Sequence, residues 1–112
     1  MANQPNHTTK VTTTVRTERE LRPPQMYDVV LYNDNVTTME FVVALLMTVF
    51  EYDREAAVSK MLQIHHSTSQ VIATYPKTVA EYKKQEAEAF KTEWGYPYCR
   101  LEIVPHGGEA HP

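Results

Sequence analysis

The side chains best suited to chemistry are a single cysteine and two adjacent histidines. Cys99 lies in a segment rich in β-formers, where a lone cysteine is usually a small buried apolar residue. On a helix, His65 and His66 would point about 100° apart, and no second His or Cys pair has zinc-site spacing. The acidic residues single out no pair for acid–base catalysis. We therefore expect no catalytic residue, no metal and no cofactor, and hence no enzyme.

Short polar side chains form a second candidate group. Asn33-Asp34-Asn35 separates two apolar segments, and such a tripeptide by itself is typical of a turn that leads into a helix. His65 follows the apolar Met61 and Ile64 and by itself is typical of a helix end. At this point both features admit a structural interpretation as well as a binding one.

The elements that must position these residues can be read from caps and breakers. We expect Thr37 or Thr38 to cap the first helix and Asp53 to cap the second. Pro76 is expected as the first residue of a third helix, which Gly95 ends. The expected segments are a strand, two helices, a strand, a helix and a strand, at residues 26–32, 39–50, 53–66, 70–75, 76–94 and 98–104.

This order, β-α-α-β-α-β, favours an α+β fold. The two β-helix-β connections predict a small three-stranded antiparallel sheet packed against three helices on one of its faces. The segment 39–50, MEFVVALLMTVF, is apolar nearly all round, so we expect this helix to be buried on most of its sides.

Composition limits the classes of function. The chain has 112 residues, 42% of them hydrophobic, and a net charge of -3. Its pI of about 5.9 argues against a general nucleic-acid-binding surface, and no apolar run is long enough to cross a membrane. With one cysteine and no apolar stretch at the N-terminus, we expect a cytoplasmic protein.

The charge and the apolar residues are unevenly distributed. Residues 1–24 are rich in threonine, lack aromatic residues, and carry four basic against two acidic side chains, so we expect a disordered arm. Residues 25–104 form the expected folded core, and residues 105–112 a flexible tail. We expect this compact acidic domain to be a monomer.

Longer motifs give a family resemblance. Residues 33–42 read N-D-x-x-T-x-M-E-F-V, and M-L-x-x-H follows at residues 61–65. With Pro23-Pro24 before them and V-A-E-Y-K at residues 79–83 after them, these motifs resemble the ClpS family. Members of that family are bacterial adaptors that deliver N-end-rule substrates to the ClpA unfoldase of the ClpAP protease.

The resemblance implies a site for a free N-terminal residue. It implies that Asn33, Asp34, Asn35 and His65 bind the α-amino group, and that Met39 excludes β-branched first residues. It also implies that Lys83 faces the N-terminal domain of a ClpA-type AAA+ unfoldase, and that residues 1–24 deliver the substrate. A first residue such as Leu, Phe, Tyr or Trp would enter an apolar pocket lined by Leu31, Tyr32, Thr37, Met39, Val42, Met61, Ile64 and Tyr98.

Two departures from the family pattern favour an alternative function. Asn35 stands where a second aspartate is common, and Tyr98 is bulkier than the usual leucine. The alternative is a divergent ClpS-like module that docks on a Clp unfoldase and modulates it without recognising N-terminal residues. A third interpretation, a general protein-interaction domain, rests on a fold-level analogy with a ribosomal stalk protein.

Overall fold

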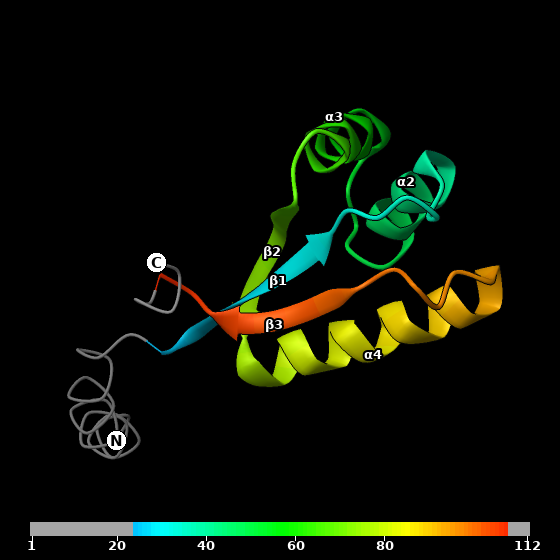
Figure 1. Ribbon diagram of the computed structural model, residues 1–112. Coiled ribbons are helices and arrows are strands. Elements are labelled where there is room, and N and C mark those ends of the chain that lie inside the picture. The colour runs from blue at the N-terminus through cyan, green and yellow to red at the C-terminus, as the bar shows by residue number, and fades with distance from the viewer. Residues whose placement is uncertain (1–23, 108–112) are drawn as a thin grey trace, which may run out of the picture.

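The computed structural model describes residues 24–107, so all but the last residue of the expected N-terminal arm lies outside the described part. The predicted order β-α-α-β-α-β is confirmed (Figure 1). Among residues 24–107, no helix combines the length and the apolarity that a membrane crossing needs. The elements are β1 (Met26–Tyr32), α2 (Met39–Thr48), α3 (Arg54–His65), β2 (Ser69–Pro76), α4 (Lys77–Trp94) and β3 (Leu101–Pro105).

The sheet is antiparallel, as predicted, with β1 between β2 and β3. Val29 pairs with Ala73 but Val30 pairs with Val71, so Ile72 is an extra residue in β2. This bulge bends the strand, and Ile72 is buried in the core. Helix α4 runs along the sheet and contacts all three strands, whereas α2 and α3 lie together beyond the end of β1 (Figure 1).

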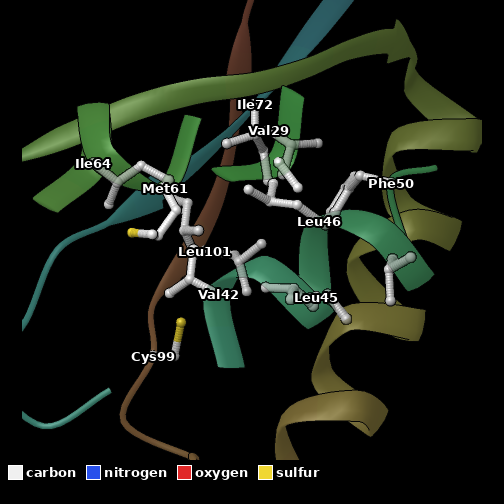
Figure 2. Close-up of a cluster of buried hydrophobic side chains, with 14 of the residues drawn as sticks. Val29, Val42, Leu45, Leu46, Phe50, Met61, Ile64, Ile72, Cys99 and Leu101 are labelled. Carbon is white, nitrogen blue, oxygen red and sulfur yellow. The ribbon is translucent and has the colours of Figure 1, made fainter. Parts of the chain in front are cut away.

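One apolar cluster joins the sheet to all three helices. Val29 and Leu31 are two residues apart on β1, so they share a face, and both are fully buried. Figure 2 shows Met61 of α3 beside Val42 of α2 and Leu101 of β3. Because every helix contributes to the cluster beneath Val29 and Leu31, the helices cover the same face of the sheet. Further members are Phe41, Leu45, Leu46, Phe50, Ala57, Ile64, Ile72, Ala80, Ala87 and Cys99.

Helix α2 leaves one side uncovered, and the expectation that it is buried on most sides is wrong. Phe41, Leu45 and Leu46 are fully buried, but Met39 and Met47 are 44% and 36% exposed. The physical reason is the small number of elements. With α3 on one flank of α2 and α4 near another, no described element covers the remaining side.

Side-chain caps fix the helix ends as expected. Thr38 Oγ1 accepts a hydrogen bond from Phe41 N at 3.2 Å, and Asp53 Oδ1 accepts one from Ala56 N at 2.8 Å. At the end of α4, Gly95 has a φ of 82°, a left-handed conformation that glycine adopts without steric cost.

Several boundaries differ from the prediction, most of them by one residue. Pro76 is not the first helical residue: it pairs with Met26 as the last residue of β2 and has extended ψ of 159°. The third strand begins at Leu101 rather than residue 98, because Cys99 N bonds back to Tyr96 O in a turn. Helix α2 ends at Thr48, two residues earlier than expected.

The sheet continues into residues that the sequence assigned to the tail. His106 N donates to Met26 O at 2.9 Å, and its ring Nδ1 lies 2.8 Å from Asp28 Oδ1. The hydroxyl of Thr74 donates to the same oxygen at 2.7 Å. Asp28 therefore connects β1 with β2 and with the residue that follows β3, on the face of the sheet opposite Val29. The remaining residues of the expected tail, 108–112, lie outside the described part.

Lys83 holds the connection between α2 and α3. Its Nζ donates to Val49 O at 2.8 Å and lies 3.4 Å from Glu51 Oε2. Glu51 adopts a φ of 62°, which is costly for a residue other than glycine. Burial by itself would lower the pKa of Lys83, but the charges of Glu51 and Glu86 outweigh it, and the pKa lies above its usual value. The charge of Lys83 therefore stabilises the connection between α2 and α3. A contact of Lys83 with an unfoldase stays a prediction.

We expect Lys83→Met to lower the free energy of unfolding by about 1–2 kcal/mol, because it removes the charged donor to the Val49 carbonyl and keeps the apolar stem. Urea denaturation measures this difference. The matched control is Lys77→Met, an exposed lysine at the start of the same helix. An equal loss in both variants would contradict the assigned role.

Candidate functional site

The loop between β1 and α2 and the end of α3 enclose a cavity of about 440 Å³. This cavity brings together all four residues expected at an α-amino group and five of those expected in an apolar pocket. Val36 and Thr38 also line it and were not expected there, although their place inside the same short loop was an available signal. The lining residues are Asn33, Asp34, Asn35, Val36, Thr37, Thr38, Met39, Val42, Met61, Ile64 and His65.

The carboxylate of Asp34 shapes this loop. Its Oδ1 accepts hydrogen bonds from Val36 N at 2.7 Å and Thr37 N at 2.6 Å, and its Oδ2 accepts one from the Thr37 hydroxyl at 2.7 Å. Burial by itself would raise the pKa of Asp34, but these hydrogen bonds outweigh it, so the pKa lies below its usual value. The loop therefore carries a fixed negative charge at neutral pH.

Asn33 ties the loop to the end of α3. Its backbone N donates to Thr68 O at 3.0 Å, and its side-chain Nδ2 donates to His65 O at 3.3 Å. Ser67 stabilises the turn that follows α3, since its hydroxyl donates to Gln63 O at 2.8 Å. The amide oxygen of Asn33 is left without a hydrogen-bond donor among residues 24–107 and can accept one from a ligand.

Acceptors and apolar side chains meet at one cavity. The side chains of Asn35 and His65 are exposed, and within residues 24–107 neither forms a hydrogen bond. Val42, Met61 and Ile64 are buried apolar residues of the lining, and Figure 2 shows Met61 between Ile64 and Val42. This arrangement can hold a donor group, such as an amine, next to an apolar side chain.

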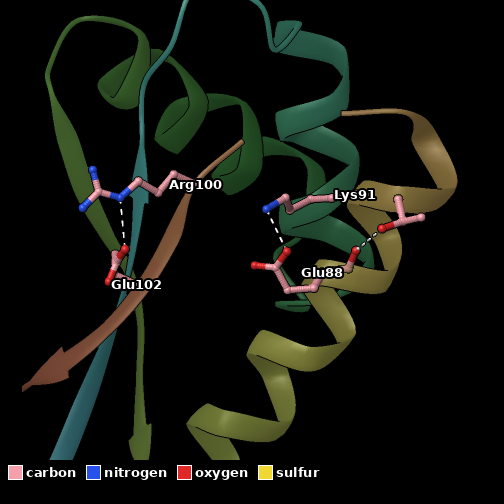
Figure 3. A network of polar contacts seen from close by, with 5 residues as sticks. Glu88, Lys91, Arg100 and Glu102 are labelled. Carbon is pink, nitrogen blue, oxygen red and sulfur yellow. Dashed lines mark hydrogen bonds and ion pairs between the residues drawn. The ribbon is translucent and has the colours of Figure 1, made fainter. Parts of the chain in front are cut away.

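Three residues expected in the apolar pocket do not line the cavity. Leu31 is fully buried inside the main cluster. Tyr32, the next residue of β1, points to the opposite face of the sheet, where the Arg100 guanidinium lies 4.2 Å from its ring centroid. Arg100 in turn pairs with Glu102 (Figure 3). Tyr98 lies in the turn before β3 and is 68% exposed.

Cys99 is buried near the loop, and burial favours the neutral form of its thiol. Burial raises the pKa of its thiol to about 11, although the nearby Lys91 ammonium acts in the opposite direction. Lys91 itself is buried and pairs with Glu88 at 2.8 Å (Figure 3). At pH 7 only about one thiol in ten thousand would be ionised. Among the residues that the structure describes, no group of three or more His, Cys, Asp or Glu side chains could hold a metal ion.

The fold and the site together define a small binding domain in which a loop of hydrogen-bond acceptors adjoins an apolar cavity. The family model of the ATP-dependent Clp protease adaptor protein ClpS matches residues 22–99. The chain therefore belongs to the ClpS family, whose members are adaptors of the ATP-dependent Clp protease.

Individual relatives agree with this assignment. The ATP-dependent Clp protease adapter protein ClpS of Myxococcus xanthus is 41% identical over 108 residues, 96% of this chain and 100% of the relative. The protein of the same name from Lawsonia intracellularis is 41% identical over 88 residues, 78% of this chain and 81% of the relative. Agrobacterium tumefaciens ClpS2 bound to L-phenylalaninamide superposes with a TM-score of 0.68 at 31% identity, covering 74% of this chain and 99% of that chain.

We expect Asp34→Ala to lower the free energy of unfolding by about 1–2 kcal/mol at neutral pH, because all three hydrogen bonds to the carboxylate are lost. Asp34→Asn should cost less, because an amide oxygen can still accept from the backbone of the loop. Urea denaturation measures both losses, with Asn35→Ala in the same loop as the control.

The destabilisation caused by Asp34→Ala should become smaller as the pH falls. The folded pKa of Asp34 lies below the usual value of about 3.9 for an aspartate. The stabilisation is therefore complete above that value and disappears as the pH falls through the folded pKa. The gap between the wild type and Asp34→Ala should therefore shrink as the pH is lowered towards about 3. A gap that stays constant, or an equal loss in Asn35→Ala, would contradict the role given to the carboxylate.

Proposed function

We propose that this chain binds the N-terminal residue of substrate proteins and delivers them to the ClpA-type unfoldase of the Clp protease. The α-ammonium group would bind Asn33, Asp34, Asn35 and His65, and a large first side chain such as Leu, Phe, Tyr or Trp would enter the cavity. The observation that carries this proposal is the direct junction of acceptors and apolar residues around one cavity of about 440 Å³.

The ligand of the structural relative supports the same two-part recognition. L-phenylalaninamide, which Agrobacterium tumefaciens ClpS2 binds, has a free α-amino group next to a benzyl side chain. In this chain the amide oxygen of Asn33 and the imidazole of His65 could accept two of the three ammonium hydrogens. The negative charge of Asp34 lies in the same loop and favours a cation there.

Two contributions of similar size to the binding free energy should determine which N-terminal residues bind. Burial of a Leu or Phe side chain contributes about 1.5–3 kcal/mol. An N-terminal acetyl group would remove the ammonium and leave the acceptors of the loop without their donors, which costs about 1–3 kcal/mol. Selectivity should therefore depend on the free amino group as much as on the first side chain.

Delivery requires a second surface and a second segment. We propose Lys83 as part of the surface that contacts the N-terminal domain of the unfoldase, and residues 1–24, nearly all of which lie outside the described part, as the delivery segment. Lys83 does not line the recognition site, since the described lining residues lie between Asn33 and His65.

Fluorescent peptides that begin with Leu, Phe, Trp, Val or acetyl-Leu test the recognition step by anisotropy titration. We expect the first three to bind and the last two to bind at least about tenfold more weakly, since one lost interaction of about 1.4 kcal/mol is a factor of ten. Equal binding of acetyl-Leu refutes recognition of the amino group. If none of the peptides binds, the alternative gains support: a module that docks on the unfoldase without recognising N-terminal residues.

We expect Asn35→Asp to tighten the Leu peptide several-fold at low salt, because it adds a carboxylate to the ammonium site. Asn35→Ser, which restores no charge, is the matched control. The gain should decrease as salt is added, since exposed charges are screened. An unchanged affinity, or an equal gain in Asn35→Ser, would show that charge at residue 35 does not limit binding.

A further inference from the structure

A hollow between α2 and α3 adjoins the candidate site, and a second hollow adjoins the first along α3. The first hollow beyond the site, of about 420 Å³, shares Met39 and Met61 with it. A second hollow, of about 700 Å³, shares Arg54 and Val58 with the first, and its lining residues are Asp53 and residues of α3. We call this path the α2–α3 groove. Its lining residues are Met39, Glu40, Val43, Ala44, Met47, Asp53, Arg54, Glu55, Val58, Ser59, Met61 and Leu62.

The groove exposes apolar side chains that the core does not use. Met39 and Leu62 are each 44% exposed and Met47 is 36% exposed. Met39 and Met47 line the same hollow, and exposed apolar surface of this kind is typical of interaction sites. Unbranched methionine side chains adapt to different partners. The residues of this surface belong to α2 and α3, and these two helices lie next to each other (Figure 1).

The dimensions of the groove suit an extended peptide. It follows α3 from His65 back to Asp53, and a helix of 12 residues is about 18 Å long. That length matches five or six residues of extended chain. In an extended chain, side chains one and three project to the same side about 7 Å apart. A first residue in the candidate site would therefore place its third side chain beyond Met39.

We propose that the α2–α3 groove is a second subsite for the same substrate peptide and binds an apolar side chain at its third position. The inference rests on the proposed function, because the free N-terminus sets the register of the peptide. The occupant follows from continuity: Met39 and Met61 line both the candidate site and the first hollow, so a peptide that leaves the candidate site on this side enters the first hollow directly.

Paired peptides of six residues test the subsite in the full-length chain. Both begin with Leu-Ala, and the third residue is Leu in one and Ser in the other. We expect the Leu peptide to bind about threefold to tenfold more tightly, as partial burial of one aliphatic side chain predicts. Met47→Lys should reduce this ratio to about one. The control is Val71→Lys, an exposed apolar residue of β2 outside the groove, and it should leave the ratio unchanged.

The outcomes separate this inference from the proposed function. Equal binding of the two peptides overturns the subsite and leaves N-terminal recognition intact, whereas failure of both to bind overturns the proposed function. A ratio that persists in Met47→Lys also overturns the subsite. When Leu is moved along the peptide, a gain at position four or five instead of three would indicate a helical occupant and would overturn the extended register.

Discussion

The carboxylate of Asp34 determines how the chain passes from the sheet into the helices. By accepting hydrogen bonds from Val36 and twice from Thr37, it folds the loop back on itself just before Thr38 caps α2. Asn33 then fastens this loop to the last turn of α3. The cavity exists because these local and long-range hydrogen bonds hold the loop beside α3, and the negative charge that shapes the loop also favours a cationic ligand.

A small domain leaves surface uncovered, and here that surface lies next to the site. Three helices and three strands cover one side of α2 but not the side that carries Met39 and Met47. Hydrogen bonds and ion pairs therefore stabilise the edges of the fold. Lys83 holds the α2–α3 connection, and Asp28 joins the three strands. Because Met39 belongs to the site and to the open side, the two proposed subsites, for the first residue and for the chain that follows it, adjoin each other.

Local signals predicted most of the fold. The strand at residues 26–32, the caps Thr38 and Asp53, and the left-handed Gly95 were predictable because each depends on residues within a few positions. The two errors at strand ends had one distant and one local cause. Pro76 stays in the sheet because it pairs with Met26, and β3 starts late because the chain first turns at Cys99.

By itself the sequence predicted, through its resemblance to the ClpS family, that Asn33, Asp34, Asn35, Met39 and His65 belong to one site, and all five line the same cavity. Only the tertiary structure decided the orientation of the others. Leu31 and Tyr32 are neighbours, yet one enters the core and the other the opposite face, because strand side chains alternate and the sheet has its helices on one side only. Likewise, only packing between distant segments exposes Tyr98 and leaves the α2–α3 groove open.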